Sequence, residues 1–92
     1  MQSYYPVFLN LAGKRSVVIG GGPVAQGKIA KLSESGSHVT VISPEVTPAI
    51  CQAAQAKSVA WLERAYQPGD LADAFLAIAA TNQRSVNQQI LQ

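Results

Sequence analysis

A chain of 92 residues, 48% of them apolar, can form one small globular domain and is not composed like a disordered protein. Its formal charge of +2, with basic residues scattered singly apart from Lys14-Arg15, does not indicate a nucleic-acid or membrane-surface partner. No apolar run approaches the roughly 18 residues of a transmembrane helix, and the N-terminus has no signal-peptide layout. The single cysteine excludes a disulfide framework and fits a reducing cytoplasm, so we expect a cytoplasmic protein.

The first half of the chain alternates short apolar runs with a helical pattern. Residues 16–19 form a β-branched apolar run closed by glycines, which predicts a strand buried on both faces. The next helix is expected to begin at Pro23, which suits a first helical turn, and to end at Gly36. Residues 38–42 predict a second strand.

The second half continues the alternation with weaker elements. Thr47 and Pro48 suit the N-cap and first residue of a helix that runs to about Lys57. The remaining expected elements are a strand over residues 58–64, a turn over 68–70, a short helix over 71–74, a strand over 75–80, and a last helix that Thr81 or Asn82 caps, with Val86 and Ile90 facing inward.

This order of elements predicts the fold class. Alternation of strands and helices indicates right-handed crossovers and an α/β architecture, a Rossmann-like doubly wound parallel sheet with helices on both faces. Such a sheet normally sends at least one further strand back beside the fourth. We therefore expect residues 1–92 to be the N-terminal portion of a nucleotide-binding domain, truncated after the fourth strand and its helix.

A glycine-rich turn between the first strand and its helix carries the main functional signal. The pattern is G-x-G-x-x-A, from Gly20 to Ala25, in the strand–turn–helix setting of a dinucleotide fingerprint. Gly20 permits the tight turn, Gly22 lets a pyrophosphate approach the backbone, and Ala25 allows close helix packing. The helix N-terminus offers N–H groups and partial positive charge to phosphates. The alternative is a glycine turn of purely structural importance.

The second half of that fingerprint is missing. An acid about 20 residues on usually binds the adenosine ribose, whereas Ile42 or Ser43 stands at this position. The Ser43 hydroxyl, the Pro44 backbone or Glu45 can substitute for it, although Glu45 is equally explained as a solvated acid in the first turn of a helix. Because residues 43–56 contain no Lys or Arg, NAD is favoured over NADP as cofactor.

Other polar or reactive residues are candidates for the same site. Thr81 and Asn82 follow the fourth strand, where they can hydrogen-bond the nicotinamide half of the cofactor or simply cap the next helix. His38 begins a strand at the opposite end of the sheet and is not expected to be a catalytic base. Cys51, the single cysteine, is expected to be a buried structural thiol, with no disulfide or metal cluster.

Several motifs stand in a characteristic order along the chain: Tyr5-Pro6-Val7-Phe8-Leu9, Gly13-Lys14, residues 17–25 with Lys28, Val39-Thr40-Val41-Ile42-Ser43-Pro44, and Ala79-Ala80-Thr81-Asn82 followed by Val86-Asn87. Together they resemble one family, the siroheme synthase N-terminal domain, which is precorrin-2 dehydrogenase. The resemblance implies an enzyme that oxidises precorrin-2 to sirohydrochlorin with NAD, and some members also insert iron. It also implies a tetrapyrrole substrate and a homodimer.

The resemblance further implies roles for individual residues. Cofactor contacts fall on Gly21, Gly22, Pro23 and Val24, on Pro44 and Glu45, and on Thr81 near the nicotinamide. Two departures stand out. Asn82 and Gln83 replace acidic residues common in the family, and the family's proposed catalytic aspartate lies on a strand beyond Gln92. We therefore assign no catalytic residue within the chain and expect it to be inactive alone.

A second hypothesis of a different class is an NAD-sensing regulatory domain of a potassium-transport protein. Fold alone does not separate the two. Sensing domains usually keep the acid after the second strand, where Ser43 stands here, and this difference favours the dehydrogenase.

Overall fold

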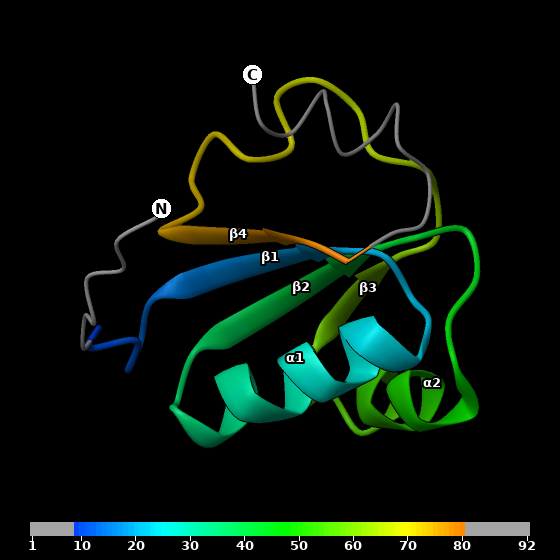
Figure 1. Cartoon of the computed structure of the whole chain (residues 1–92), viewed down its shortest axis with the longest axis horizontal. Helices are drawn as coiled ribbons and strands as arrows, with labels where there is room; N and C mark the ends of the chain where they lie inside the picture. The colour runs from blue at the N-terminus through cyan, green and yellow to red at the C-terminus, as the bar shows by residue number, and fades with distance from the viewer. Residues whose placement is uncertain (1–8, 81–92) are drawn as a thin grey trace, which may run out of the picture.

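The structure is a computed structural model that describes residues 9–80. Strands and helices alternate along this part of the chain, as predicted (Figure 1). In order they are β1 (Arg15–Ile19), α1 (Pro23–Glu34), β2 (His38–Ile42), α2 (Pro48–Gln55), β3 (Ala60–Leu62) and β4 (Leu76–Ala79).

The strands form one parallel sheet in the order β3-β2-β1-β4. The chain moves outward from β1 through β2 to β3 and then returns to place β4 on the other side of β1. This reversal makes the carboxyl ends of β1 and β4 the topological switch point, where ligands bind in sheets of this kind. The sheet confirms the predicted α/β, Rossmann-like fold class.

One face of the sheet packs against both helices of the described chain (Figure 1). The apolar residues of α1 recur every three or four positions and are buried, as the spacing predicts. Thr47 caps α2 by accepting a hydrogen bond on Oγ1 from the Ile50 backbone N–H at 3.3 Å. The buried core between helices and sheet consists of Val18, Ala25, Ile29, Leu32, Val39, Val41, Ile50 and Val59.

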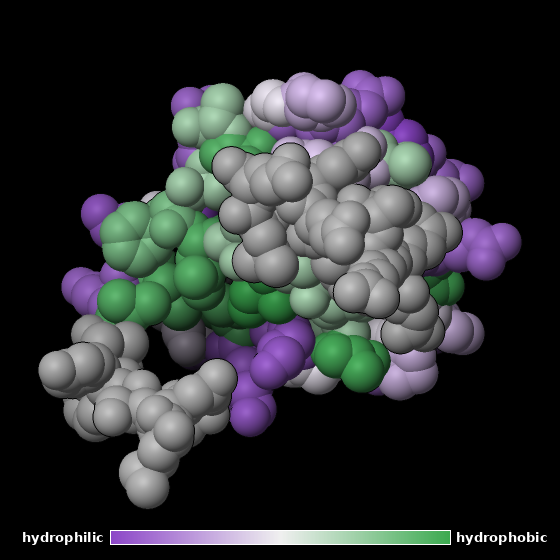
Figure 2. Space-filling model, turned by 45° about the horizontal axis from the view of Figure 1, so that its top comes forward, coloured by the Kyte–Doolittle hydropathy of each residue, from purple (hydrophilic) through white to green (hydrophobic). Residues whose placement is uncertain are grey.

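The opposite face is covered differently from the prediction. The short helix expected over residues 71–74 is wrong, because this part of the β3–β4 crossover is a series of turns. Backbone bonds from Asp70 to Gln67 and from Ala74 to Leu71 each span three residues. Residues 63–75 therefore cross the sheet as a loop, and within residues 9–80 both helices lie on one face of the sheet. Figure 2 turns this side toward the viewer and shows apolar side chains (green) at its surface.

Some predicted boundaries also shift. The second helix ends at Gln55 instead of Lys57, because Lys57 takes a left-handed conformation with φ 62°. The third strand shrinks to residues 60–62 and the fourth to 76–79. Both are edge strands of the described sheet, and each therefore has hydrogen bonds to a neighbouring strand on one side only. The predicted last helix, with Val86 and Ile90, lies outside the described residues.

Candidate functional site

A cavity of about 710 Å³ lies at the carboxyl ends of β1 and β2. It sits beside the switch point between β1 and β4, so the fold places it where a doubly wound sheet binds its ligands. Its walls come from the turn before α1, the loop before α2, the start of the β3–β4 crossover and the end of β4. The lining residues are Ile19, Gly20, Gly21, Gly22, Pro23, Val24, Ile42, Ser43, Pro44, Glu45, Val46, Thr47, Ala65, Tyr66 and Ala80.

The turn after β1 has the features that its glycine pattern predicts. Gly20 has φ +130°, a conformation that a side chain would strain, and its N–H donates to the Ile42 carbonyl at 3.0 Å. At Gly22, the N-cap of α1, an added Cβ would meet no atom of residues 9–80 within 4 Å. Ala25 is fully buried against the sheet. The backbone at Gly22 is thus open to a ligand.

The middle glycine, Gly21, has a role that the sequence analysis did not identify. A Cβ on Gly21 would collide with the Glu45 carbonyl oxygen and would lie 2.9 Å from the Val46 Cα. The Gly21 carbonyl in turn accepts a hydrogen bond from the Thr47 N–H at 2.9 Å. The glycine turn and the loop after β2 are therefore packed backbone to backbone and form one continuous wall.

The N-terminus of α1 gives this wall its electrostatic character. The backbone N–H groups of Val24 and Ala25 belong to the first helical turn and have no acceptor within the helix. The first turn contains no acidic residue to offset the positive end of the helix dipole. The Val24 side chain is 65% exposed beside the cavity. A phosphate group meets the requirements of this position.

The loop after β2 is held by hydrogen bonds that involve Ser43. Its buried hydroxyl donates to the Glu45 carbonyl at 2.6 Å. Its carbonyl accepts from the indole N–H of Trp61 on β3 at 2.9 Å. The proton of the Ser43 hydroxyl is therefore committed to shaping the loop, and the oxygen retains acceptor capacity.

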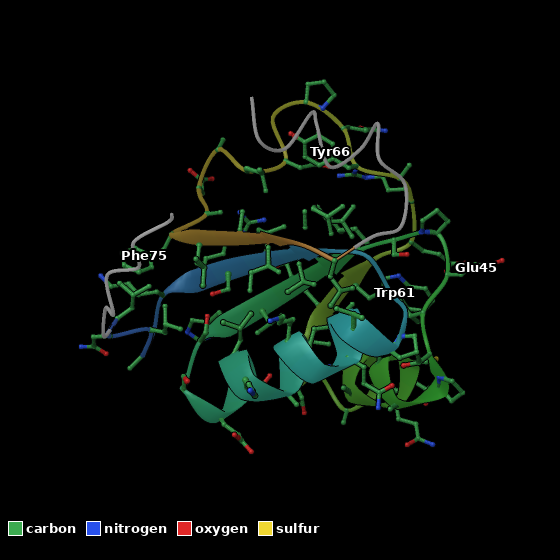
Figure 3. The ribbon with its side chains drawn as sticks, viewed as in Figure 1. Glu45, Trp61, Tyr66 and Phe75 are labelled. Carbon is green, nitrogen blue, oxygen red and sulfur yellow. The ribbon has the colours of Figure 1, made fainter. Side chains whose placement is uncertain are left out.

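The three residues expected to replace the missing acid all line the cavity, but differently. Ser43 is buried, whereas Pro44 and Glu45 are exposed at the rim. Figure 3 shows the Glu45 side chain pointing outward, away from the sheet. Glu45 therefore puts a negative charge at the rim of the cavity.

Two further lining residues, Ala65 and Tyr66, were missed by the sequence analysis. They follow β3, and Figure 3 shows Tyr66 on the side of the sheet away from the helices. Tyr66 packs on Val17, Ile19 and Ile42. A lone tyrosine in a loop gives no periodic signal in the sequence. Its place in the cavity becomes visible only in the structure, where the crossover passes back over the sheet.

The other residues considered in the sequence analysis do not line this cavity in the described part of the chain. Thr81 and Asn82 lie outside the described residues. His38 lies at the opposite end of β2 and lines a different hollow, as predicted. Cys51 is half-buried, so the expectation of a buried thiol is wrong; its neighbour Ile50 occupies the core position on α2. Among residues 9–80 we find no group of side chains suited to hold a metal ion and no helix long and apolar enough to cross a membrane.

The parallel sheet with its glycine turn, open helix N-terminus and switch-point cavity defines a dinucleotide-binding domain of the Rossmann class. Residues 7–92 match the family described as "Putative NAD(P)-binding", and the chain belongs to this family.

Two relatives and one solved structure show which members of this family the chain is similar to. The chain is 34% identical over 87 residues to a precorrin-2 dehydrogenase of Bacillus subtilis, covering 95% of this chain and 54% of the relative. It is 36% identical over 89 residues to siroheme synthase 3 of Aeromonas hydrophila, covering 97% of this chain and 19% of the relative. The solved structure of SirC, a precorrin-2 dehydrogenase, matches with TM-score 0.88 and 29% identity, covering 92% of this chain and 43% of SirC.

The chain thus spans about a fifth of the length of the siroheme synthase and about half that of the two dehydrogenases. These similarities confirm the resemblance drawn from the sequence motifs. They give no support to the hypothesis of a sensing domain of a potassium-transport protein.

Proposed function

We propose that this chain is the NAD-binding part of a precorrin-2 dehydrogenase. The observation that carries the proposal is the open backbone at Gly22, the N-cap of α1, in a chain similar to a precorrin-2 dehydrogenase. The overall reaction is precorrin-2 plus NAD⁺ giving sirohydrochlorin, NADH and a proton. The cofactor supplies the hydride acceptor, and the protein supplies binding and orientation.

The residues of the cavity fit this cofactor in three parts. Gly20, Gly21, Gly22, Pro23 and Val24 form the pyrophosphate position, where the N–H groups of Gly21, Gly22 and Val24 can donate, because Pro23 has no N–H and the Gly20 N–H donates to the Ile42 carbonyl. Ser43, Pro44 and Glu45 lie at the carboxyl end of β2, where the adenosine ribose binds in this fold. For the nicotinamide half we propose Thr81 and Asn82, which follow directly on Ala80 at the edge of the cavity.

NAD is proposed in preference to NADP. The 2′-phosphate of NADP needs a cation near the ribose, and residues 43–56 provide none. The exposed carboxylate of Glu45 at the rim repels a phosphate dianion.

The proposal includes the wider setting of the domain. Residues 1–92 are the N-terminal portion of the nucleotide-binding domain, the substrate is a tetrapyrrole, and the active protein is a cytoplasmic homodimer. The titratable side chains that line the cavity within residues 9–80 are Glu45 and Tyr66, and Glu45 points outward. The family resemblance places the catalytic aspartate on a strand beyond Gln92, so we propose that the proton-transfer group lies there, and we assign no catalytic residue within residues 1–92.

The test is formation of sirohydrochlorin, followed by absorbance, from enzymatically generated precorrin-2 and NAD. The 92-residue chain is compared with a chain extended past Gln92. The extended chain should turn over, and the 92-residue chain should bind NAD without turnover. Equal rates would place the catalytic group within residues 1–92. An extended chain that binds NAD but never oxidises precorrin-2 would refute the proposed substrate.

A further inference from the structure

The crossover from β3 to β4 brings an aromatic ring to the cavity from the face of the sheet without helices. Tyr66 rests on Val17, Ile19 and Ile42, which are 0–3% exposed and belong to β1 and β2. The same residue lines the cavity, as does the loop that contains Ser43. Tyr66 therefore contacts both the apolar surface of the sheet and the cavity, on the side of the sheet away from the helices (Figure 3).

An ion pair holds the segment that carries this ring. Arg64 donates from Nη1 to Asp70 Oδ2 and from Nη2 to Asp70 Oδ1, both at 2.8 Å. Asp70 Oδ2 also accepts from the Gln67 backbone N–H at 2.7 Å, and Arg64 Nη1 also donates to the Ala65 carbonyl at 3.0 Å. These hydrogen bonds tie the two ends of segment 64–70 together, and Tyr66 lies within that segment.

The geometry of the pair explains why it can fix a loop. Two parallel N–H···O bonds between guanidinium and carboxylate set orientation as well as distance, which a lysine cannot do. The Asp70 side chain is 11% exposed, so water competes weakly for its oxygens. The crossover contains no helix, and its order depends on these contacts together with the packing of Tyr66, Leu71 and Ala74 on the sheet.

We propose that Tyr66 contacts the adenosine half of the bound dinucleotide, and that the Arg64–Asp70 pair is a positioning pair that holds the ring there. The proposal rests on the dinucleotide site proposed above. The adenosine half is favoured because Tyr66 lines the same cavity as Ile42 and Ser43 at the carboxyl end of β2, and it packs on the apolar cluster that includes Ile42. An aromatic ring offers such a ligand a flat apolar surface of large contact area.

The first test measures NADH affinity of the 92-residue chain by fluorescence titration. Tyr66→Ala should weaken NADH binding about tenfold, because the ring surface is lost. Tyr66→Phe should stay within about twofold, since the ring remains. Tyr66→Leu retains apolar cover on the sheet, and it should also weaken binding. Phe75→Ala is the matched control, because Phe75 is 52% exposed on the same crossover, away from the cavity.

The second test locates the contact and the role of the pair. Tyr66→Ala should weaken AMP as much as NADH and leave nicotinamide mononucleotide unchanged. Arg64→Lys should weaken NADH binding. Added to Tyr66→Ala, it should cause no further loss of NADH affinity, because the Arg64–Asp70 pair acts through the Tyr66 ring. Additive losses in this double-mutant cycle would overturn the positioning role.

The outcomes separate this inference from the proposed function. If the unaltered chain binds NADH and folded Tyr66→Ala and Tyr66→Leu bind it equally well, the contact is refuted while the dinucleotide site stands. If the unaltered chain binds no dinucleotide at all, the site itself is refuted, and the role of Tyr66 falls with it.

Discussion

The carbonyl oxygen of Glu45 occupies the space that a Cβ atom on Gly21 would need. This contact joins two loops that are more than 20 residues apart in the chain and that form adjacent walls of the cavity. The next glycine is in the opposite situation, because a Cβ on Gly22 would meet no atom of the described chain. The two neighbours therefore make a matched pair for mutation, one packed against backbone and one open beside the cavity.

Gly21→Ala should destabilise the domain, while Gly22→Ala should not. The collision at Gly21 forces backbone of the opposite loop to move, at a cost of about 1–3 kcal/mol typical of overpacking. Gly22 has φ −87° and open space, so its change should stay within about 0.5 kcal/mol. Chemical denaturation of both variants measures the difference, and equal stabilities would contradict the backbone contact.

Gly22→Val should abolish NAD binding in a domain that still folds. The branched side chain stands where the pyrophosphate must approach the backbone. Calorimetric titration with NAD measures the loss, and circular dichroism checks the fold. A folded variant with unchanged affinity would show that the pyrophosphate does not bind at this turn.

NAD should bind more tightly than NADP. The loop after β2 lacks a cation for the 2′-phosphate, and the Glu45 carboxylate adds repulsion. Calorimetry of both cofactors at one ionic strength gives the ratio, and Glu45→Gln should narrow it. Equal affinities in the unaltered chain would mean that the ribose binds elsewhere.

Trp61→Phe should weaken the cofactor site through the loop that it supports. The variant keeps an aromatic ring but loses the indole N–H that donates to the Ser43 carbonyl at 2.9 Å. Loss of one such hydrogen bond costs about 1 kcal/mol of stability. We expect this loss in denaturation and a parallel weakening of NAD binding. A variant with unchanged stability and unchanged NAD affinity would show that Trp61 does not support the loop.

Asp70→Asn should lower stability at neutral pH and matter less in acid. Hydrogen bonds from Arg64, followed by the Gln67 backbone N–H and nearby positive charge, hold the pKa of the Asp70 carboxyl below its usual value. A lowered folded-state pKa stabilises the fold fully above the unfolded-state value of about 4, and this contribution is lost as pH falls through the folded pKa. Denaturation midpoints of the two proteins, measured from pH 7 to pH 3, should therefore converge. A constant gap would contradict the ionised pair.

The strand–turn–helix unit could be predicted because its signals are local. A β-branched run, glycines and Pro23 each restrict the backbone within a few residues, and the structure has β1, the turn and α1 in those places. The predicted α2 cap at Thr47 rests on a similarly local hydrogen bond. By contrast, the turns over residues 68–73 replace a predicted helix because the crossover is organised by contacts with the sheet.

Contacts between distant residues lay beyond sequence reasoning. Ser16 is fully buried in β1, and its hydroxyl is 2.6 Å from that of Ser37, which itself donates to the Lys14 carbonyl. This bond exists because parallel pairing brings the starts of β1 and β2 together. In the same way, the packing of Gly21 on Glu45 depends on how two loops meet at the edge of the sheet.

The loop between β3 and β4 also has a consequence for local unfolding, because different parts of the domain should open at different free energies. β1 has a strand on each side, so its amides should exchange with solvent deuterium last. Residues 63–75 have few backbone ladder bonds, and they should exchange first, in local openings that leave the sheet intact. The binding surface would then consist of a rigid floor with one wall that opens on its own, and a bound nucleotide should slow exchange in that wall most.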